Sequence, residues 1–69
     1  MKRLTWAANL TEAEMIAGLL AQDGIDVVIQ RQPGMDVPDF LGGGPRILFV
    51  DEADHATAAE VVEAHFGLR

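Results

Sequence analysis

The chain has no cysteine and few basic residues, and both shortages limit its chemistry. Without cysteine, its 69 residues hold no disulfide bridge, thiolate metal ligand or thiol nucleophile, and we expect a cytoplasmic location. Five lysines and arginines stand against eleven acids, which gives a formal net charge of -6. Because phosphate contacts need clustered cations, we expect neither a nucleic acid nor an anionic membrane as a partner.

Serine and long apolar stretches are also missing. With no serine, and with no base placed near Thr5 or Thr57 by any motif, a nucleophile triad has no support. No apolar run approaches the roughly 20 residues of a membrane span, and the start lacks the apolar region of a signal peptide. We therefore expect a single non-enzymatic domain over residues 1–69, with no catalytic residues, no cofactor and no metal.

The apolar content is high for so short a chain. Apolar residues make up 49% of the sequence, yet a chain of this size buries only about 60% of the surface that its unfolded form exposes. Apolar surface is then left over, and its association with a second copy would stabilise the fold. The composition thus favours a homodimer.

Two segments have the apolar spacing of amphipathic helices. The first is predicted from about residue 12 to 23, with Thr11 and Glu14 as a capping box and Gly24 as a left-handed residue at its end. Asp51 is expected to cap the second, which ends at Gly67. The apolar stripe of the second helix consists of Ala58, Ala59, Val62 and Phe66.

Three segments are typical of strands. In the first, Leu4, Trp6 and Ala8 alternate with other residues, which predicts that Trp6 lies in the core. The second runs from residue 25 to about 31. The third holds four consecutive apolar residues, 47–50, which predicts a central strand covered on both faces.

These elements predict an α+β fold, a ferredoxin-like half-sheet with strand order 1-3-2 and both helices on one face. A right-handed crossover makes the first two strands parallel, and the third returns between them. Such a sheet leaves one face uncovered, towards which Val28 and one of two pairs, Ile47 with Phe49 or Leu48 with Val50, must point. If the first strand is the open edge, Trp6 instead anchors a dimer interface with Val28 and Phe49.

The sequence resembles a small bacterial family of unknown function that is described as a putative prokaryotic signal-transducing protein. The similarity rests on residues 9–20, on Gly24 with Ile25, and on residues 47–50 leading into Asp51, Asp54 and Ala58. The resemblance implies a ferredoxin-like fold, distantly like the PII-type nitrogen regulators, and no known catalytic residues. His55 departs from it, since an aliphatic residue is expected there.

The stretch from Gln32 to Gly44 is the most distinctive segment. Its two prolines and four glycines predict an irregular connector, while its apolar side chains indicate that it folds over the sheet or faces a partner. Consecutive glycine amides can also bind an anion, with Arg46 or Arg31 supplying charge. The residues predicted to bind a ligand or partner are Met35, Phe40, Leu41, Gly42, Gly43, Gly44 and Arg46.

His55 lies near the start of the second helix, on its inner stripe. We expect a half-buried neutral histidine there; a metal shared between subunits is the alternative, because His65 is too far along the helix to bind the same ion.

The sequence thus favours a small binding or regulatory domain that engages a protein partner or a small ligand through residues 34–46 and the open sheet face. The alternatives are an anion or metabolite sensor at Gly42–Gly44 and a small metal-dependent enzyme using His55.

Overall fold

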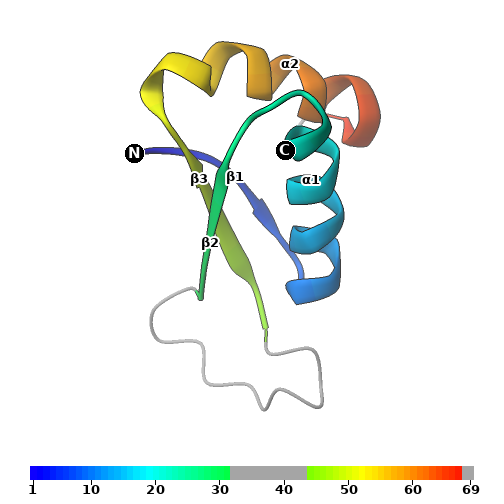
Figure 1. Cartoon of the computed structure of the whole chain (residues 1–69). Coiled ribbons are helices and arrows are strands. Elements are labelled where there is room, and N and C mark those ends of the chain that lie inside the picture. Colours follow the sequence, from blue (N-terminus) through cyan, green and yellow to red (C-terminus); the bar gives the residue numbers. More distant parts are fainter. Residues whose placement is uncertain (32–43, 68–69) are drawn as a thin grey trace.

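The described part of the chain, residues 1–31 and 44–67 of a computed structural model, forms a layer of strands and a layer of helices (Figure 1). The order of the main elements is strand, helix, strand, strand, helix, as predicted. The elements are β1 (Lys2–Ala7), α1 (Leu10–Gln22), β2 (Val27–Arg31), β3 (Arg46–Val50), the short 3-10 helix η2 (Glu52–Asp54) and α2 (His55–Phe66).

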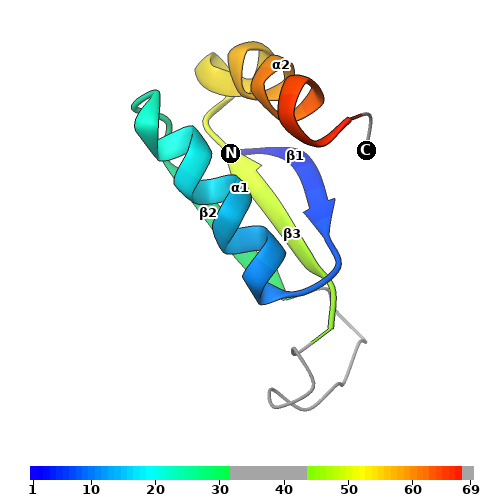
Figure 2. The same cartoon turned by 90° about the vertical axis from the view of Figure 1, so that its right-hand side faces the viewer.

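The three strands form one sheet in the order β1-β3-β2, and β3 is antiparallel to both neighbours. The predicted strand order is therefore confirmed. Figure 2 shows both helices on the same side of the sheet, with α2 across one end of it. None of the described elements covers the other side; the predicted central position of β3 is confirmed, and the cover on its second face stays a prediction.

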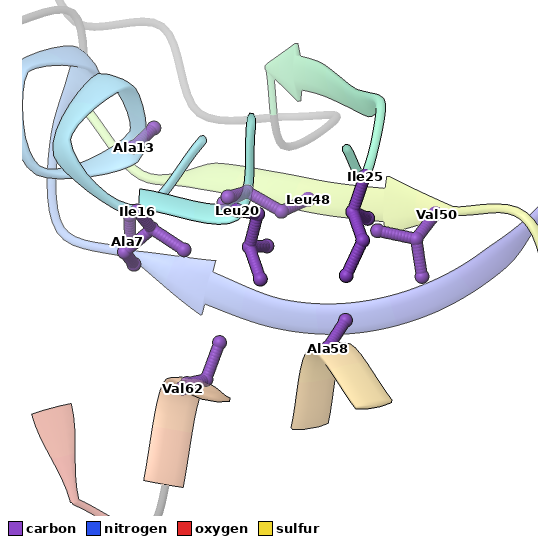
Figure 3. Close-up of a cluster of buried hydrophobic side chains, with 9 residues drawn as sticks. All are labelled: Ala7, Ala13, Ile16, Leu20, Ile25, Leu48, Val50, Ala58 and Val62. Carbon is purple, nitrogen blue, oxygen red and sulfur yellow. The ribbon is translucent and has the colours of Figure 1, made fainter. Parts of the chain in front are cut away.

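The core lies between the sheet and the two helices. From β3, Leu48 and Val50 point into it, and from α1, Ile16 and Leu20 meet them (Figure 3). Because side chains alternate along a strand, burying Leu48 and Val50 turns their neighbours Ile47 and Phe49 to the opposite face. The remaining buried apolar residues are Ala7, Ala13, Ile25, Ala58 and Val62.

Helix α1 begins two residues earlier than the capping box predicted. Asn9 is the N-cap, and its Oδ1 accepts a hydrogen bond of 2.8 Å from the Glu12 amide. The Glu12 carboxylate accepts in turn from the Ala8 amide at 3.3 Å. The cap is therefore on Asn9 in place of Thr11, because asparagine caps at least as well as threonine, and the Glu12 carboxylate binds the amide of the residue before the cap and not that of the cap itself.

Gly24 ends α1 in the left-handed conformation that the sequence predicted. Its φ is 75°, and its amide donates to the Ala21 carbonyl while the Ile25 amide donates to Leu20. This pair of bonds is the Schellman motif, and the apolar contact that accompanies it is supplied here by Leu20 and Ile25, both in the core. Ile25 therefore belongs to the end of the helix, and β2 begins only at Val27.

Strand β1 contains a bulge that reverses the face on which Trp6 lies. Arg3 pairs with Phe49 and Thr5 with Leu48, so Leu4 is an extra residue between them. Thr5 and Ala7 are consequently buried and Trp6 is 43% exposed. The predicted inward face of Leu4, Trp6 and Ala8 is thus wrong: of these, only Leu4 packs against the core.

Helix α2 follows β3 through η2, which the sequence did not predict, and Asp51 therefore caps η2 in place of α2. The Asp51 carboxylate accepts from the Ala53 amide at 3.0 Å, which caps η2. Ala58 and Val62 are the buried residues of α2, and Phe66 packs against the same core. Three of the four predicted stripe residues are thus confirmed, whereas Val61 packs against the core in place of Ala59. The end of the helix at Gly67, with a φ of 79°, is confirmed.

Replacing Asn9 tests the position of the α1 cap. In Asn9→Ala the Glu12 amide loses its acceptor, and we expect the free energy of unfolding to fall by about 1 kcal/mol. Thr11→Ala is the matched control: Thr11 is exposed within the helix, where alanine has the higher helix propensity, so this variant should change stability by less than about 0.5 kcal/mol. Urea denaturation of both variants measures the difference, and a larger loss for Thr11→Ala would contradict the assignment.

Replacing Thr5 tests the loss of stability caused by the hydroxyl group that the bulge buries. Thr5 is 5% exposed, and its hydroxyl has no hydrogen-bond partner among the described residues. Thr5→Val keeps the shape and removes the unsatisfied group, so we expect unfolding to require about 1 kcal/mol more. Thr57→Val, on the exposed surface of α2, should change stability little. Equal urea midpoints for Thr5→Val and the unchanged chain would show that the hydroxyl finds a partner.

Candidate functional site

The open face of the sheet, defined as the side chains of Arg3, Trp6, Val28, Gln30, Ile47 and Phe49, is the candidate site. Cross-strand partners point to the same side of a sheet. Trp6, Ile47 and Gln30 are partners across the three strands and form one row, and Arg3, Phe49 and Val28 form the next. The rows are adjacent because Ile47 and Phe49 are two residues apart on β3.

Four of these side chains are apolar and contiguous. Trp6 is 43% exposed and Val28 is 39% exposed, while Ile47 and Phe49 between them are half-buried. Large apolar residues scattered singly over a surface need no explanation, whereas contiguous ones make this face the candidate for an interaction. Arg3 and Gln30, both exposed, stand at diagonal corners of the patch.

The structure brings together one part of the predicted site. Trp6, Val28 and Phe49 were predicted as one interface, and they share the open face. Of the two pairs that the sequence left open, Ile47 with Phe49 is the one that points there. Whether a second copy covers the face stays a prediction.

Most of the loop part of the prediction lies outside the described residues, and only Gly44 and Arg46 can be placed. Met35, Phe40, Leu41, Gly42 and Gly43 lie outside the described residues. Gly44 has a φ of 72°, which explains glycine at this position.

Arg46 begins β3 on the helix side of the sheet. It is only 6% exposed, and its Nη1 donates to the Gly44 carbonyl at 2.8 Å. Its partners across the sheet are Ala7 and Arg31. Arg46 therefore lies on the opposite side of the sheet from Trp6 and Phe49. Its hydrogen bond to the Gly44 carbonyl fixes the backbone at the start of β3.

His55 is half-buried, as expected, and its ring connects α2 to β1. Its Nε2 lies 2.9 Å from the Arg3 carbonyl oxygen. A carbonyl oxygen can only accept, so we assign the proton to Nε2, which donates this bond. The bond joins the start of α2 to the bulged part of an edge strand, and this contact accounts for a histidine where an aliphatic residue was expected.

The acidic clusters make helix-capping bonds. Glu12 and Asp51 accept from backbone amides at the start of α1 and η2, which is the capping role that the sequence indicated. Within residues 1–31 and 44–67, no group of three or more histidine, cysteine, aspartate or glutamate side chains is placed to hold a metal ion. In the same residues no helix is long and apolar enough to cross a membrane.

The described cations lie in strands, whereas most of the described acids lie in helices. The cations of the described residues are Lys2, Arg3, Arg31 and Arg46. Seven of the described acids lie in the helices or at their ends: Glu12, Glu14, Asp23, Glu52, Asp54, Glu60 and Glu63. The other two flank strands, since Asp26 directly precedes β2 and Asp51 directly follows β3.

Sequence reasoning missed Arg3 and Gln30 as members of the open face, and it named Ile47 only within one of two alternative pairs. Arg3 lies in a segment that could be predicted as a strand, as every described cation does, and this strand membership was the signal that could have placed it in the sheet. Gln30 and Ile47 needed the register of the sheet, which fixes them as partners.

One comparison with known proteins gave a match. Residues 1–65 match the model of a family described as "Putative prokaryotic signal transducing protein". No curated protein and no solved structure matched the chain.

Replacing His55 tests its role in joining α2 to β1. His55→Ala removes the hydrogen bond to the Arg3 carbonyl and part of a half-buried ring, so we expect stability to fall by about 1–2 kcal/mol. His65→Ala, at an exposed position of the same helix, should cost less than about 0.5 kcal/mol. Urea denaturation measures both, and hydrogen exchange at the start of α2 should accelerate only in His55→Ala.

Proposed function

The chain belongs to the family described as putative prokaryotic signal transducing proteins, and from this we propose that it is a non-enzymatic binding module whose open face engages a partner. The family description indicates signalling and leaves the partner unnamed. A signalling domain without chemistry of its own acts through a surface that another molecule recognises. The question is therefore which surface of this chain is suited to recognition.

The observation that supports this proposal is the apolar content of the open face. Trp6, Phe49, Ile47 and Val28 form a contiguous patch on the side of the sheet that no described helix covers. Aromatic residues are enriched where binding energy is concentrated, because they bury much area with few rotatable bonds. Trp6 on an edge strand is suited to be such an anchor.

The rigidity of the patch also favours binding. Its six side chains stand on strands, and β3 is paired on both sides. Beneath it, Leu48 and Val50 are fully buried against the helices. A surface held in this way loses little conformational entropy when a partner binds. The cytoplasmic location and the homodimer expected from the composition stay predictions within this proposal.

Capture from a bacterial extract that contains a family member's natural partners tests the proposal. The chain is immobilised beside the variants Trp6→Ser and Val28→Ser, which remove apolar surface from the open face. Met15→Ser is the matched control, because Met15 is exposed on α1, in the other layer. We expect a protein that the chain and Met15→Ser retain and that both face variants lose by roughly tenfold, as for an anchor residue.

Folding of every variant is checked by circular dichroism and urea denaturation before capture. If each protein retained by the chain is retained equally by Trp6→Ser and Val28→Ser, the open face is not the binding surface and the proposal is wrong.

A further inference from the structure

The two outer strands of the sheet differ in how their edges are protected, and this difference indicates where a second copy of the chain binds. We propose that β2 pairs with β2 of a second copy, antiparallel and with Val28 opposite Val28, to form one six-stranded sheet. An unpaired strand edge offers its backbone amides and carbonyls to another strand. The contact lies along the edge of the sheet and not on the open face, so it goes beyond the proposed function.

The edge of β1 is protected in three ways. A bulge at Leu4 interrupts its register, and the exposed cations Lys2 and Arg3 lie along it. The Arg3 carbonyl also accepts a hydrogen bond from the His55 ring on α2. Bulges, edge charges and covering groups are the devices by which proteins prevent other strands from pairing at an edge. β1 is therefore a poor template for another strand.

The edge of β2 has none of these devices. Its five residues pair with β3 without a register shift, and they include neither proline nor lysine. Among the described residues no strand lies on its other side. It contains the apolar run Val27, Val28 and Ile29, and Val28 is 39% exposed. A regular apolar edge of this kind is a template for strand pairing, so β2 is the edge at which a strand is added.

The residues of β2 match one another when the pair is centred on Val28. Partners in an antiparallel pair point to the same face, and this centre places Val27 opposite Ile29, both apolar and half-buried. It also places Asp26, which directly precedes β2, opposite Gln30 of the second copy. The Gln30 amide can donate to this carboxylate, and a hydrogen bond to an ionised acceptor is stronger than a neutral one. Apolar side chains thus meet apolar ones, and polar side chains meet polar ones.

Other alignments match less well. Because the backbone groups that point outward occur on alternate residues, the centre of the pair must fall on a residue and not between two. A centre on Ile29 would place Val28 opposite Gln30. A centre on Val27 would place Val28 opposite Asp26. Each of these sets an exposed apolar side chain against a polar one, so the chain favours the centre on Val28.

The net charge of -6 on each copy opposes association, and the alignment limits this repulsion. Asp26 of each copy lies opposite Gln30 of the other, so the two Asp26 carboxylates are four positions apart along the strands. At about 3.3 Å per residue this separates them by about 13 Å. The Debye length is about 8 Å at physiological ionic strength, so their repulsion is largely screened.

The contact is small, and this sets its strength. An edge of five residues is about 17 Å long, and it buries less than the roughly 800 Å² per partner of a standard stable interface. The attraction comes from about four backbone hydrogen bonds and from the contact between the two Val28 side chains. We therefore expect a dissociation constant on the order of 100 µM, in the range of transient contacts.

The pairing also joins the two open faces. Because partners point to the same face, both copies keep their open faces on one side of the six-stranded sheet and their helices on the other. The two Val28 side chains then lie at the centre, and each has Phe49 of its own copy as its other neighbour across the sheet. The dimer thus presents a two-fold symmetric surface built from both open faces.

Opposite charges placed at Val28 test the alignment. In a homodimer, Val28→Asp and Val28→Lys each set two like charges opposite one another, which is destabilising across strands. We expect each variant alone to dimerise roughly tenfold more weakly than the unchanged chain. An equimolar mixture of the two should recover the dimer to within about threefold, because aspartate is then opposite lysine. Sedimentation equilibrium from about 10 µM to about 1 mM measures each sample.

Two control variants separate position from charge. Met15→Asp and Met15→Lys carry the same charges on α1, where Met15 is exposed, and they should dimerise like the unchanged chain, alone and mixed. Both Val28 variants keep a net negative charge, so overall charge does not drive their mixing. Circular dichroism and urea denaturation confirm that every variant is folded before it is measured.

Hydrogen exchange and salt locate the contact independently. As the concentration rises, the outward-pointing amides of residues 27–30 should exchange more slowly, while those of β1 should not change. Raising the salt concentration from about 0.01 M to about 0.15 M should tighten the dimer, because it screens the repulsion between two acidic copies.

Four results would overturn the inference. The first is a chain that stays monomeric up to about 1 mM. The second is slow exchange of the outward β2 amides at every concentration, which would mean that one copy covers its own edge. The third is a dimer that both Val28 variants weaken and their mixture does not recover. The fourth is a dimer that is lost in Trp6→Ser, which would identify a contact through the open face.

The capture experiment decides the proposed function separately. Its Trp6→Ser variant changes the open face and leaves the edge of β2 intact, since Trp6 lies on β1. A captured partner that depends on Trp6 supports the proposed function even where the chain stays monomeric, and a dimer paired at Val28 stands even where nothing is captured.

Discussion

The burial of Leu48 and Val50 under both helices determines which side chains the rest of the sheet exposes. Because β3 is the central strand and cross-strand partners point to the same side, the alternation of its side chains determines which side chains of β1 and β2 point to each face. Once these two residues point to the helices, Ile47 and Phe49 must point away, and their partners on β1 and β2 follow them. The open face is thus a direct consequence of how the core is packed.

The bulge in β1 decides what that face contains. Without the extra residue at Leu4, the alternation in β1 would put Trp6 on the same side as Leu4, in the core. With it, Thr5 takes the inward position opposite Leu48 and Trp6 takes the outward one opposite Ile47. The inward position places a threonine hydroxyl where it has no partner among the described residues, which costs stability. The largest side chain of the chain is thereby placed at the surface, where a partner can contact it.

Strand order, helix positions and the turns at Gly24 and Gly67 could be predicted, because each rests on a local rule that nothing in the fold opposes. The N-cap of α1 is Asn9 and not the predicted Thr11, because both residue types are good N-caps and the sequence alone does not distinguish them. The direction of the chain after β1 decides which of the two caps the helix. The face of Trp6 could not be predicted, since a bulge has no sequence signature without the opposite strand. Of the candidate site, Val28 followed from alternation and Phe49 was named within one of two alternative pairs, whereas Arg3 and Gln30 required the register of the sheet.

The acid excess, which as a total argued only against polyanionic partners, has a more specific meaning once it is placed in the fold. Most acids of the described chain are in the helices, and capping and the helix dipole favour Glu12 and Asp51 at helix starts. The strands hold the four described cations, but Asp26 directly precedes β2 and Asp51 directly follows β3. The net charge of -6 therefore belongs to the whole chain and not to one layer, and acids stand at the ends of the same strands that carry Val28 and Phe49.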